Sequence, residues 1–148
     1  MRIATWVMTA ALAFAPCAAS RAAGSDDNDV MAVVKDYLGY MNQGAVEKFV
    51  ALCAPQTIII DDFPPHTWQG PNACVDWLTA FAAYDSGKAI TPRAVTIGKP
   101  WRLSVTGDVA YVVLPATYKY VRAGEKVTES GSVWTLSLQK GQAGWRIK

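Results

Sequence analysis

Hydrophobic residues in the first half of the chain recur at helical spacing. Residues 26–29 are acidic or amide side chains that can cap a helix, and one apolar face then follows. Its members are Val30, Val33, Val34, Tyr37, Leu38 and Met41. The spacing predicts a first helix that ends at Asn42-Gln43-Gly44.

Two further helices are predicted before residue 90. A short helix runs from Ala45 to about Cys53, where Ala54-Pro55 stops it. A third helix opens at Pro71, ends at Asp85-Ser86-Gly87 and carries an apolar stripe of Cys74, Trp77, Leu78 and Phe81. Between them, Thr57 to Phe63 is typical of a strand, and residues 64–70 are typical of a loop.

The hydrophobic period changes to two after the third helix, which predicts strands. Residues 95–105 alternate, Val109 to Arg122 and Val127 to Gln139 form two long strands, and Trp145 opens a last one. Helices first and strands afterwards favour an α+β fold with an antiparallel sheet and its helices on one side. Pro115 and Gly131 lie inside strand-like runs, where they indicate bends that curl the sheet into a cone around a pocket.

The N-terminus has the order of a secretory signal peptide. Met1-Arg2 precedes an apolar run from Ile3 to Ala15 and then small residues up to Ala23. The run is shorter than the roughly 20 residues that span a bilayer. We therefore predict a cleaved signal at 1–23, a single domain at 24–148, and a periplasmic or secreted protein with no membrane attachment.

The charge and the cysteines of the chain that remains after signal cleavage limit which partners and which redox state we expect. Loss of Arg2 and Arg21 would leave 12 basic residues against 12 acidic ones, so nucleic acid is not a predicted partner. Cys53 and Cys74 would remain in an oxidising compartment. They form either a disulfide or two buried thiols, and the sequence leaves both interpretations open.

Four short motifs together carry a resemblance to a known family. They are residues 33–38 leading to Met41-Asn42-Gln43-Gly44, Ile60-Asp61-Asp62-Phe63, Trp68-Gln69-Gly70 before a helix, and Gly144-Trp145-Arg146-Ile147. In this order they resemble the nuclear transport factor 2-like superfamily, specifically its SnoaL-like members and more distantly ketosteroid isomerase. The resemblance covers residues 28–148 and implies a cystatin-like cone of curved antiparallel sheet wrapped on about three helices.

The resemblance to ketosteroid isomerase implies two catalytic residues. Tyr37 matches the tyrosine of the first helix, and Asp62 matches the base at the end of the first strand. Strand alternation puts Ile58, Ile60 and Asp62 on one side and Asp61 on the other. Burial would raise the pKa of such an aspartate. Alternatively, both acids meet solvent and Tyr37 is ordinary core.

Other parts of the isomerase site are missing or open to two interpretations. Where a second acid would stand, the chain has Val133-Trp134-Thr135, which argues against steroid isomerase activity. His66, the single histidine, either relays a proton with the aspartate or is solvated. One histidine and two cysteines do not make a metal site, so we predict no metal and no cofactor.

Aromatic residues supply a lining for a ligand pocket. Trp68, Trp77, Tyr118, Tyr120 and Trp134 are the predicted pocket residues, with core packing as the alternative. The strand faces that hold 116–122 and 128–134 form either a pocket wall or the surface of a homodimer. The sequence thus favours an exported small-molecule-binding protein, either a proton-transfer enzyme of isomerase, cyclase or dehydratase type or a non-catalytic binding or dimerisation module.

Overall fold

The helices lie in the first part of the chain. A computed structural model describes residues 23–91 and 93–148, and it contains α1 (Ala23–Gln43), α2 (Val46–Ala51) and α3 (Ala73–Gly87). The three predicted helices are thus confirmed. α1 begins before the predicted cap, so Asp26 stands in its first turn, where a negative charge is favourable. Residues 1–22 of the predicted signal peptide lie outside the described residues.

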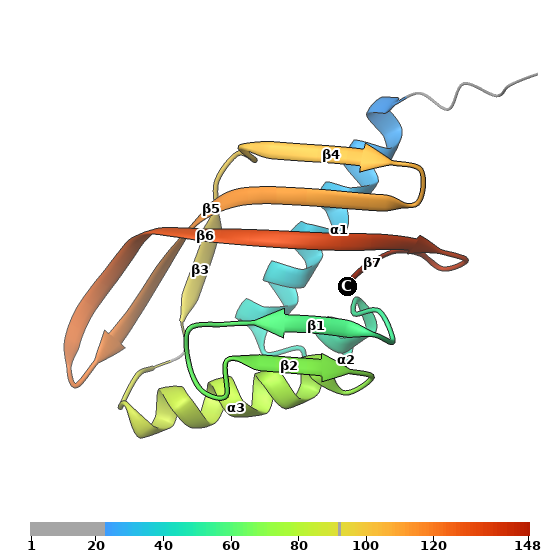
Figure 1. Ribbon diagram of the computed structural model, residues 1–148. Coiled ribbons are helices and arrows are strands. Elements are labelled where there is room, and N and C mark those ends of the chain that lie inside the picture. Colours follow the sequence, from blue (N-terminus) through green and yellow to red (C-terminus); the bar gives the residue numbers. More distant parts are fainter. Residues whose placement is uncertain (1–22, 92) are drawn as a thin grey trace, which may run out of the picture.

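Seven strands form two antiparallel sheets within the described chain (Figure 1). The small sheet is a hairpin of β1 (Thr57–Ile60) and β2 (Thr67–Gly70). The large sheet contains β3 (Ala94–Ile97), β4 (Arg102–Thr106), β5 (Val109–Arg122), β6 (Glu125–Gly141) and β7 (Gly144–Ile147). Its order is β3-β5-β6-β7, with β4 also paired to β5. The α+β cone predicted from the sequence is confirmed.

Two strand predictions need correction. Residues 67–70 were predicted as loop, but they pair with β1, with Ile59 opposite Trp68. The alternating run at 95–105 is two strands, because the chain bends between Ile97 and Arg102. The bend lies opposite Pro115, which has no backbone N–H to donate to the neighbouring strand. Gly98 lies so close to this proline that a Cβ on residue 98 would be 2.9 Å from the proline ring.

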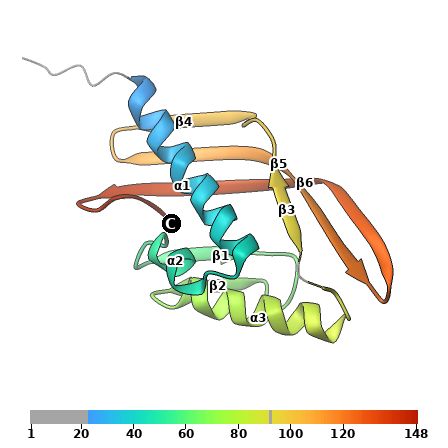
Figure 2. The same cartoon turned by 180° about the vertical axis from the view of Figure 1, so that it is seen from behind.

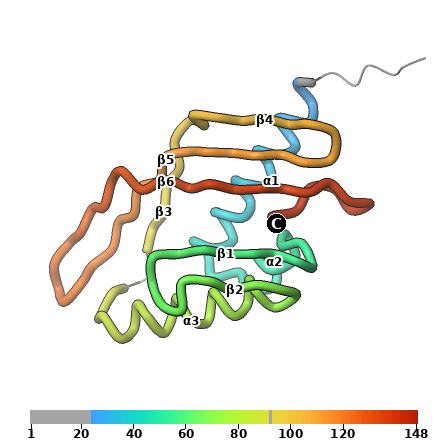
Figure 3. The backbone as a smooth tube through the Cα atoms, viewed as in Figure 1, coloured from blue at the N-terminus to red at the C-terminus, as the bar shows by residue number. Residues whose placement is uncertain are grey.

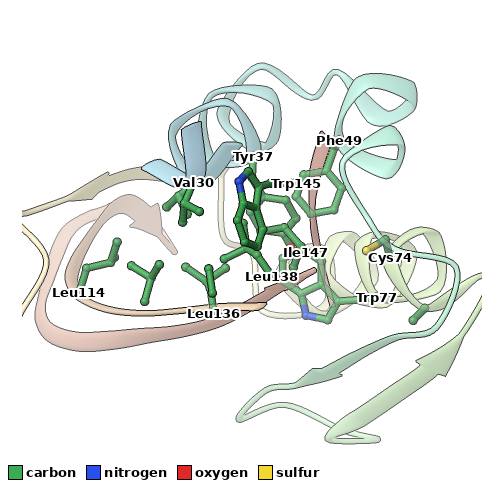
Figure 4. Close-up of a cluster of buried hydrophobic side chains, with 14 of the residues drawn as sticks. Val30, Tyr37, Phe49, Cys74, Trp77, Leu114, Leu136, Leu138, Trp145 and Ile147 are labelled. Atoms are coloured by element: carbon green, nitrogen blue, oxygen red, sulfur yellow. The ribbon is translucent and has the colours of Figure 1, made fainter. Parts of the chain in front are cut away.

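The hydrophobic core lies between α1 and one half of the β5–β6 hairpin. Figures 1 and 2 show α1 crossing one face of the large sheet, and Figure 4 shows its side chains meeting those of the strands. Val30 and Val34 of α1 are fully buried, as are Val112, Leu114 and Leu138 of the sheet. Burying such side chains stabilises the fold by about 1.5–3 kcal/mol each.

The β5–β6 hairpin bends where its register shifts. The shift lies at Ala116 and Thr117, opposite Gly131, which has a φ of +94° and adopts it without a Cβ penalty. The extra residue turns Ser130 to the opposite face from Ser132, so the predicted common face of 128–134 is interrupted. Figure 3 shows the hairpin bending, so that its far half runs in a different direction from its near half.

A disulfide joins the segment just after α2 to the start of α3. Cys53, just after α2, is bonded to Cys74 in the first turn of α3, with the two Cα atoms 6.6 Å apart. Of the two interpretations that the sequence left open, the structure therefore contains the disulfide. The bond ties the two helices that carry Phe49 and Trp77, whose rings stack with centroids 5.9 Å apart.

We expect removal of this bond to lower stability substantially. The bond closes a loop with a sequence separation of 21, for which the lost loop-closure entropy of the unfolded chain is worth about 3 kcal/mol. Thermal unfolding of the Cys53→Ala/Cys74→Ala protein should show a Tm lowered by several degrees. Dithiothreitol should lower the Tm of the wild type and leave that of the double variant unchanged. An unchanged wild-type Tm under reduction would contradict the assignment.

Candidate functional site

A cavity of about 640 Å³ opens between the helices and the far half of the β5–β6 hairpin. This volume is typical of sites for small organic molecules. Its walls come from α1, the end of β1, α3, the segment before β3, and both long strands. Aromatic and charged side chains share this lining, chiefly Tyr37, Asp61, Trp77, Phe81, Tyr84, Lys88, Arg93, Tyr118, Tyr120, Arg122, Glu129 and Trp134.

Asp61, rather than Asp62, is the acid that faces the inside. The predicted alternation along β1 is present, but the predicted face is wrong. Ile58 and Ile60 are 56% and 79% exposed, and Asp62 follows them to the outside, at the cavity rim. Thr57, Ile59 and Asp61 turn inward instead.

The face of β1 is set by the hydroxyl of Thr57. This residue is 1% exposed, and its Oγ1 donates to the carbonyl oxygens of Ala54 at 2.7 Å and Ile147 at 3.0 Å. A strand pinned in this way sends every second residue inward. The sequence interpretation took Asp62 from the resemblance to ketosteroid isomerase, and alternation alone did not show which of the two acids faces inward.

The Asp61 carboxylate is held by two donors. Trp77 Nε1 donates to Oδ2 at 2.9 Å, and the backbone N–H of Asp62 donates to Oδ1 at 2.7 Å. The pKa of Asp61 is raised, first because burial disfavours its charged form, although both hydrogen bonds act in the opposite direction. The elevation predicted for the neighbouring aspartate is therefore found at Asp61.

Trp77 holds its indole N–H in a fixed direction. Its ring stacks with those of Phe49 and Phe81, whose centroids lie 5.9 and 5.2 Å away. Both partners are nearly parallel to it, at 15° and 13°. A ring held by two stacking contacts keeps the hydrogen bond to Asp61 without losing further rotamer freedom.

Tyr37 projects from α1 into the same region. It is 7% exposed, packs on Phe49 with centroids 4.1 Å apart, and lines the cavity. The pKa of its phenol is raised, mainly by burial and further by the negative charge of Asp61. No residue in the described parts of the chain accepts a hydrogen bond from its hydroxyl. The phenol thus stays protonated and remains available as a donor.

Tyr118 provides a second phenol beside Asp61. Its oxygen accepts a hydrogen bond from Trp134 Nε1 at 2.6 Å, which leaves its own proton free to donate. Burial raises the pKa of Tyr118, and the Asp61 carboxylate adds to the increase. Accepting one hydrogen bond polarises the phenol and makes it a stronger donor. The sequence predicted both Tyr118 and Trp134 as cavity-lining residues, but it did not predict the hydrogen bond between them.

Two of the predicted site residues lie outside the cavity lining. His66 is exposed in the β1–β2 turn, and its Nδ1 approaches the backbone oxygen of Asp61 at 3.2 Å rather than any carboxylate. The predicted aspartate–histidine relay is therefore not formed. Trp68 is buried behind the wall, against Phe63 with centroids 4.9 Å apart. Trp77, Tyr118, Tyr120 and Trp134 do line the cavity.

A charged end of the cavity was not foreseen from the sequence. Arg93 follows α3 in an irregular segment and forms an ion pair with Asp85, with Nη2 2.8 Å from Oδ1. Tyr120 donates to Glu129 at 3.3 Å on the facing strand. No periodic pattern marks residue 93, so only the folded arrangement brings it beside β5 and β6.

The described residues contain no candidate metal centre. Across 23–91 and 93–148, no three of the His, Cys, Asp and Glu side chains stand where they could hold an ion together. In the same residues, no helix combines the length and the apolar character needed to cross a bilayer.

The chain matches the model of the SnoaL-like domain family over residues 30–148. No curated protein sequence matches it significantly. A nuclear transport factor 2-like superfamily protein from Salmonella enterica serovar Typhimurium has a similar structure, with a TM-score of 0.68 at 20% identity over 85% of this chain and 88% of that one.

Two other solved structures are similar to a comparable degree. An NTF2-like protein with a cystatin-like fold from Novosphingobium aromaticivorans gives a TM-score of 0.63 at 17% identity, over 83% of this chain and 77% of that one. A candidate dehydratase of the NTF2-like family from Streptomyces avermitilis gives 0.67 at 16%, over 84% and 92%. At these identities the likeness shows a shared fold alone. The match of the family model over residues 30–148 establishes that the chain belongs to the SnoaL-like domain family.

Proposed function

We propose that the protein binds a small apolar or aromatic carbonyl compound in its cavity and catalyses proton transfer on it, with Asp61 as the base. The observation that carries this proposal is the Asp61 carboxylate in the cavity wall, held by Trp77 and accompanied by two phenols. The reaction would be of isomerase, cyclase or dehydratase type. Asp61 takes the role that the sequence suggested for Asp62.

The proposed step begins with ionised Asp61. Its carboxylate removes a proton from the carbon next to the carbonyl, the C–H electron pair becomes a C=C bond, and the carbonyl π pair moves onto oxygen. In an isomerisation of a β,γ-unsaturated ketone, the oxygen pair reforms C=O, the C=C pairs shift by one bond, and the γ-carbon takes the proton from Asp61. In a dehydration, the oxygen pair reforms C=O, the enolate C=C pair becomes the new α,β double bond, and the β-hydroxyl leaves with its bonding pair and the Asp61 proton as water. Because the pKa of Asp61 is raised, its carboxylate is a stronger base than an exposed aspartate.

Tyr37 and Tyr118 would stabilise the enolate oxygen. Both phenols lie close enough to Asp61 for its charge to raise their pKa, and both have a proton to donate. A donor aimed at a developing oxyanion typically contributes about 100- to 1000-fold in rate. Tyr118, oriented by Trp134, would replace the second acid that this sequence lacks.

A non-catalytic binding module is the second candidate. The same aromatic walls would hold an apolar ligand without any chemistry. In that case the raised pKa of Asp61 would only reflect the burial of an acid that serves the structure. The two candidates differ in whether the fate of the ligand depends on Asp61.

The sharpest test of catalysis compares two adjacent aspartates. We expect the wild type to exchange the α-hydrogens of 2-tetralone, an aromatic ketone, for deuterium faster than buffer does. Asp61→Asn should lower the enzymatic exchange rate by about 100-fold or more, because the substituted amide cannot accept the proton. Proton NMR in D₂O measures the rate directly.

Asp62→Asn is the control, since it makes the same change one residue away, at the cavity rim. Because the Asp62 side chain adds to the raised pKa of Asp61, this change should lower exchange, but far less than Asp61→Asn does. Equal losses in both variants, or full activity in Asp61→Asn, would refute Asp61 as base. A wild type that binds ketones without any exchange would favour the binding module.

The raised pKa of Asp61 also predicts a pH-dependent stability difference. The native protein holds the Asp61 proton more tightly than the unfolded chain, whose reference pKa is 3.8. Stability from this group is therefore present below 3.8 and is lost as pH rises toward the folded pKa. The Tm of Asp61→Asn minus that of wild type should increase from pH 4 upward and then level off. A difference that is constant or decreases with pH would contradict the raised pKa.

We also propose that the protein is exported and forms a homodimer. The signal-like sequence at 1–23 and the Cys53–Cys74 disulfide support export, because disulfides persist outside the cytosol. Val109, Tyr111 and Val133 are exposed on the outer face of the large sheet, and a second copy could cover them.

One preparation tests both parts of this proposal. The full sequence, expressed in a bacterium, should yield periplasmic protein whose intact mass corresponds to cleavage near residue 23. Light scattering of that material should give twice the mass of the chain. Retention of residues 1–23 in the cytosol would refute export, and a monomer mass at high concentration would refute the dimer.

A further inference from the structure

Arg93 is built into the cavity wall at the end that carries Glu129. Its Nε lies 3.1 Å from both carboxylate oxygens of Asp85, and its Nη2 donates to Oδ1 at 2.8 Å. Its guanidinium carbon lies 4.6 Å from the ring centre of Tyr120, 5.2 Å from that of Phe81 and 5.9 Å from that of Tyr118. The side chain is 12% exposed. Arg93 is therefore fixed in place before any ligand arrives.

The remaining edge of this guanidinium has no hydrogen-bond acceptor, although it forms an ion pair with Glu129. Asp85 engages the Nε and Nη2 edge, while Nη1 lies 4.0 Å from Glu129 Oε2, beyond hydrogen-bonding distance. Within the described residues, no other group accepts from Nη1. Because Arg93 lines the cavity, its unused N–H groups are available to a ligand inside it.

Two further cations stand at the rim of the same end. Lys88 follows α3, and Arg122 ends β5; both are exposed and line the cavity. The bridge between Ile90 and Arg122, with the hydrogen bond from Thr91 N to Val121 O, holds the two segments together. Within the described chain, neither cation has an ion-pair partner.

The charge of this end suits a single negative charge. The three cations Arg93, Lys88 and Arg122 stand near three carboxylates: Asp85 and Glu129 beside Arg93, and Glu125 opposite Arg122 in the β5–β6 turn. This end therefore has no large positive excess that would favour a multiply charged ligand. The C-terminal carbonyl groups of α3 add partial negative charge beside Lys88 and disfavour a dianion. A carboxylate carries one charge, and its two oxygens match the fork geometry of a guanidinium.

We propose that this basic end, formed by Arg93 with Lys88 and Arg122, anchors a carboxylate group of the ligand. Tyr118 is near both ends, since its ring centre lies 5.9 Å from the guanidinium carbon of Arg93 and its phenol is affected by the charge of Asp61. A small ligand with its carboxylate at Arg93 could present its carbonyl to Asp61 in the same cavity. The ligand class is thus a small cyclic or aromatic keto acid; the keto part rests on the proposed function, whereas the carboxylate part does not.

The test is a calorimetric comparison of two matched probes. Wild type should bind 4-oxocyclohexanecarboxylate at least about tenfold more tightly than 4-oxocyclohexanecarboxamide, which has the same shape and no charge. The preference should shrink as salt is raised. Equal affinities, or no heat of binding with either probe at millimolar concentration, would overturn the proposal.

Variants locate the anchor. Arg93→Gln and the double variant Lys88→Gln/Arg122→Gln should each reduce the preference for the carboxylate. Lys99→Gln is the control, because Lys99 is exposed and lies outside the lining, and this variant should retain the preference. Arg93→Gln leaves Asp85 buried without its partner, so the double variant decides the matter if that protein does not fold. An undiminished preference in the double variant and in every folded Arg93 variant would overturn the assignment.

Asp61→Asn separates this proposal from the proposed function. It should retain the preference for the carboxylate, because the change lies at the opposite end. A preference for the carboxylate with no α-hydrogen exchange would leave the anchor intact and refute catalysis. Exchange without a preference would support catalysis and refute the anchor.

Discussion

The register shift in the β5–β6 hairpin is the constraint on which the rest of the structure depends. On the near side of Gly131, the inward residues of both strands pack against α1 and form the core. On the far side, the hairpin bends, and its inward residues Tyr118, Tyr120 and Glu129 line a cavity that also reaches Trp134 and Leu136 on the near side. A straight hairpin would continue the core packing, so one extra residue decides where packing stops and binding can start.

The cavity depends on rigid aromatic contacts for its chemistry. The Phe49, Trp77 and Phe81 rings stack in series, and the disulfide fixes the helices that carry the first two. A second indole, Trp134, orients the phenol of Tyr118. Both tryptophans donate their N–H to a polar group inside the cavity, so the aromatic residues position the acid and the phenol as well as covering the walls. Such preorganisation limits the reorganisation needed when charge develops on a ligand.

The two ends of the cavity favour different charge states, a neutral acid at one end and a cation at the other. At Asp61, burial exceeds the effect of two hydrogen bonds and favours the neutral acid. At Arg93, three hydrogen bonds from the guanidinium to Asp85 and contact with aromatic faces hold a permanent cation in a largely buried place. One end thus suits proton transfer and the other suits a fixed countercharge, which orients a ligand that has different groups at its two ends.

The sequence by itself determined the fold class, the three helices and the long strands, because those depend on local periodicity; it missed β2 and the break between β3 and β4. Helical spacing at Val30, Val34 and Tyr37 and alternation along β5 are properties of neighbouring residues, and the turn glycines limit the alternatives. The same local pattern identified four aromatic side chains of the cavity and both members of the Cys53–Cys74 pair as candidates, although it left the bond itself open.

Only the tertiary structure decided which acid faces the cavity and where its cation lies. Alternation separates Asp61 from Asp62 but does not say which side is inside; the bonds from Thr57 to Ala54 and Ile147 settle that, and Ile147 is 90 residues away. Arg93 lies in no periodic segment and reaches the site because its neighbours pair with β5. Such long-range contacts cannot be predicted from a local pattern, because the pattern shows which residues alternate along a segment but not which distant residues they contact.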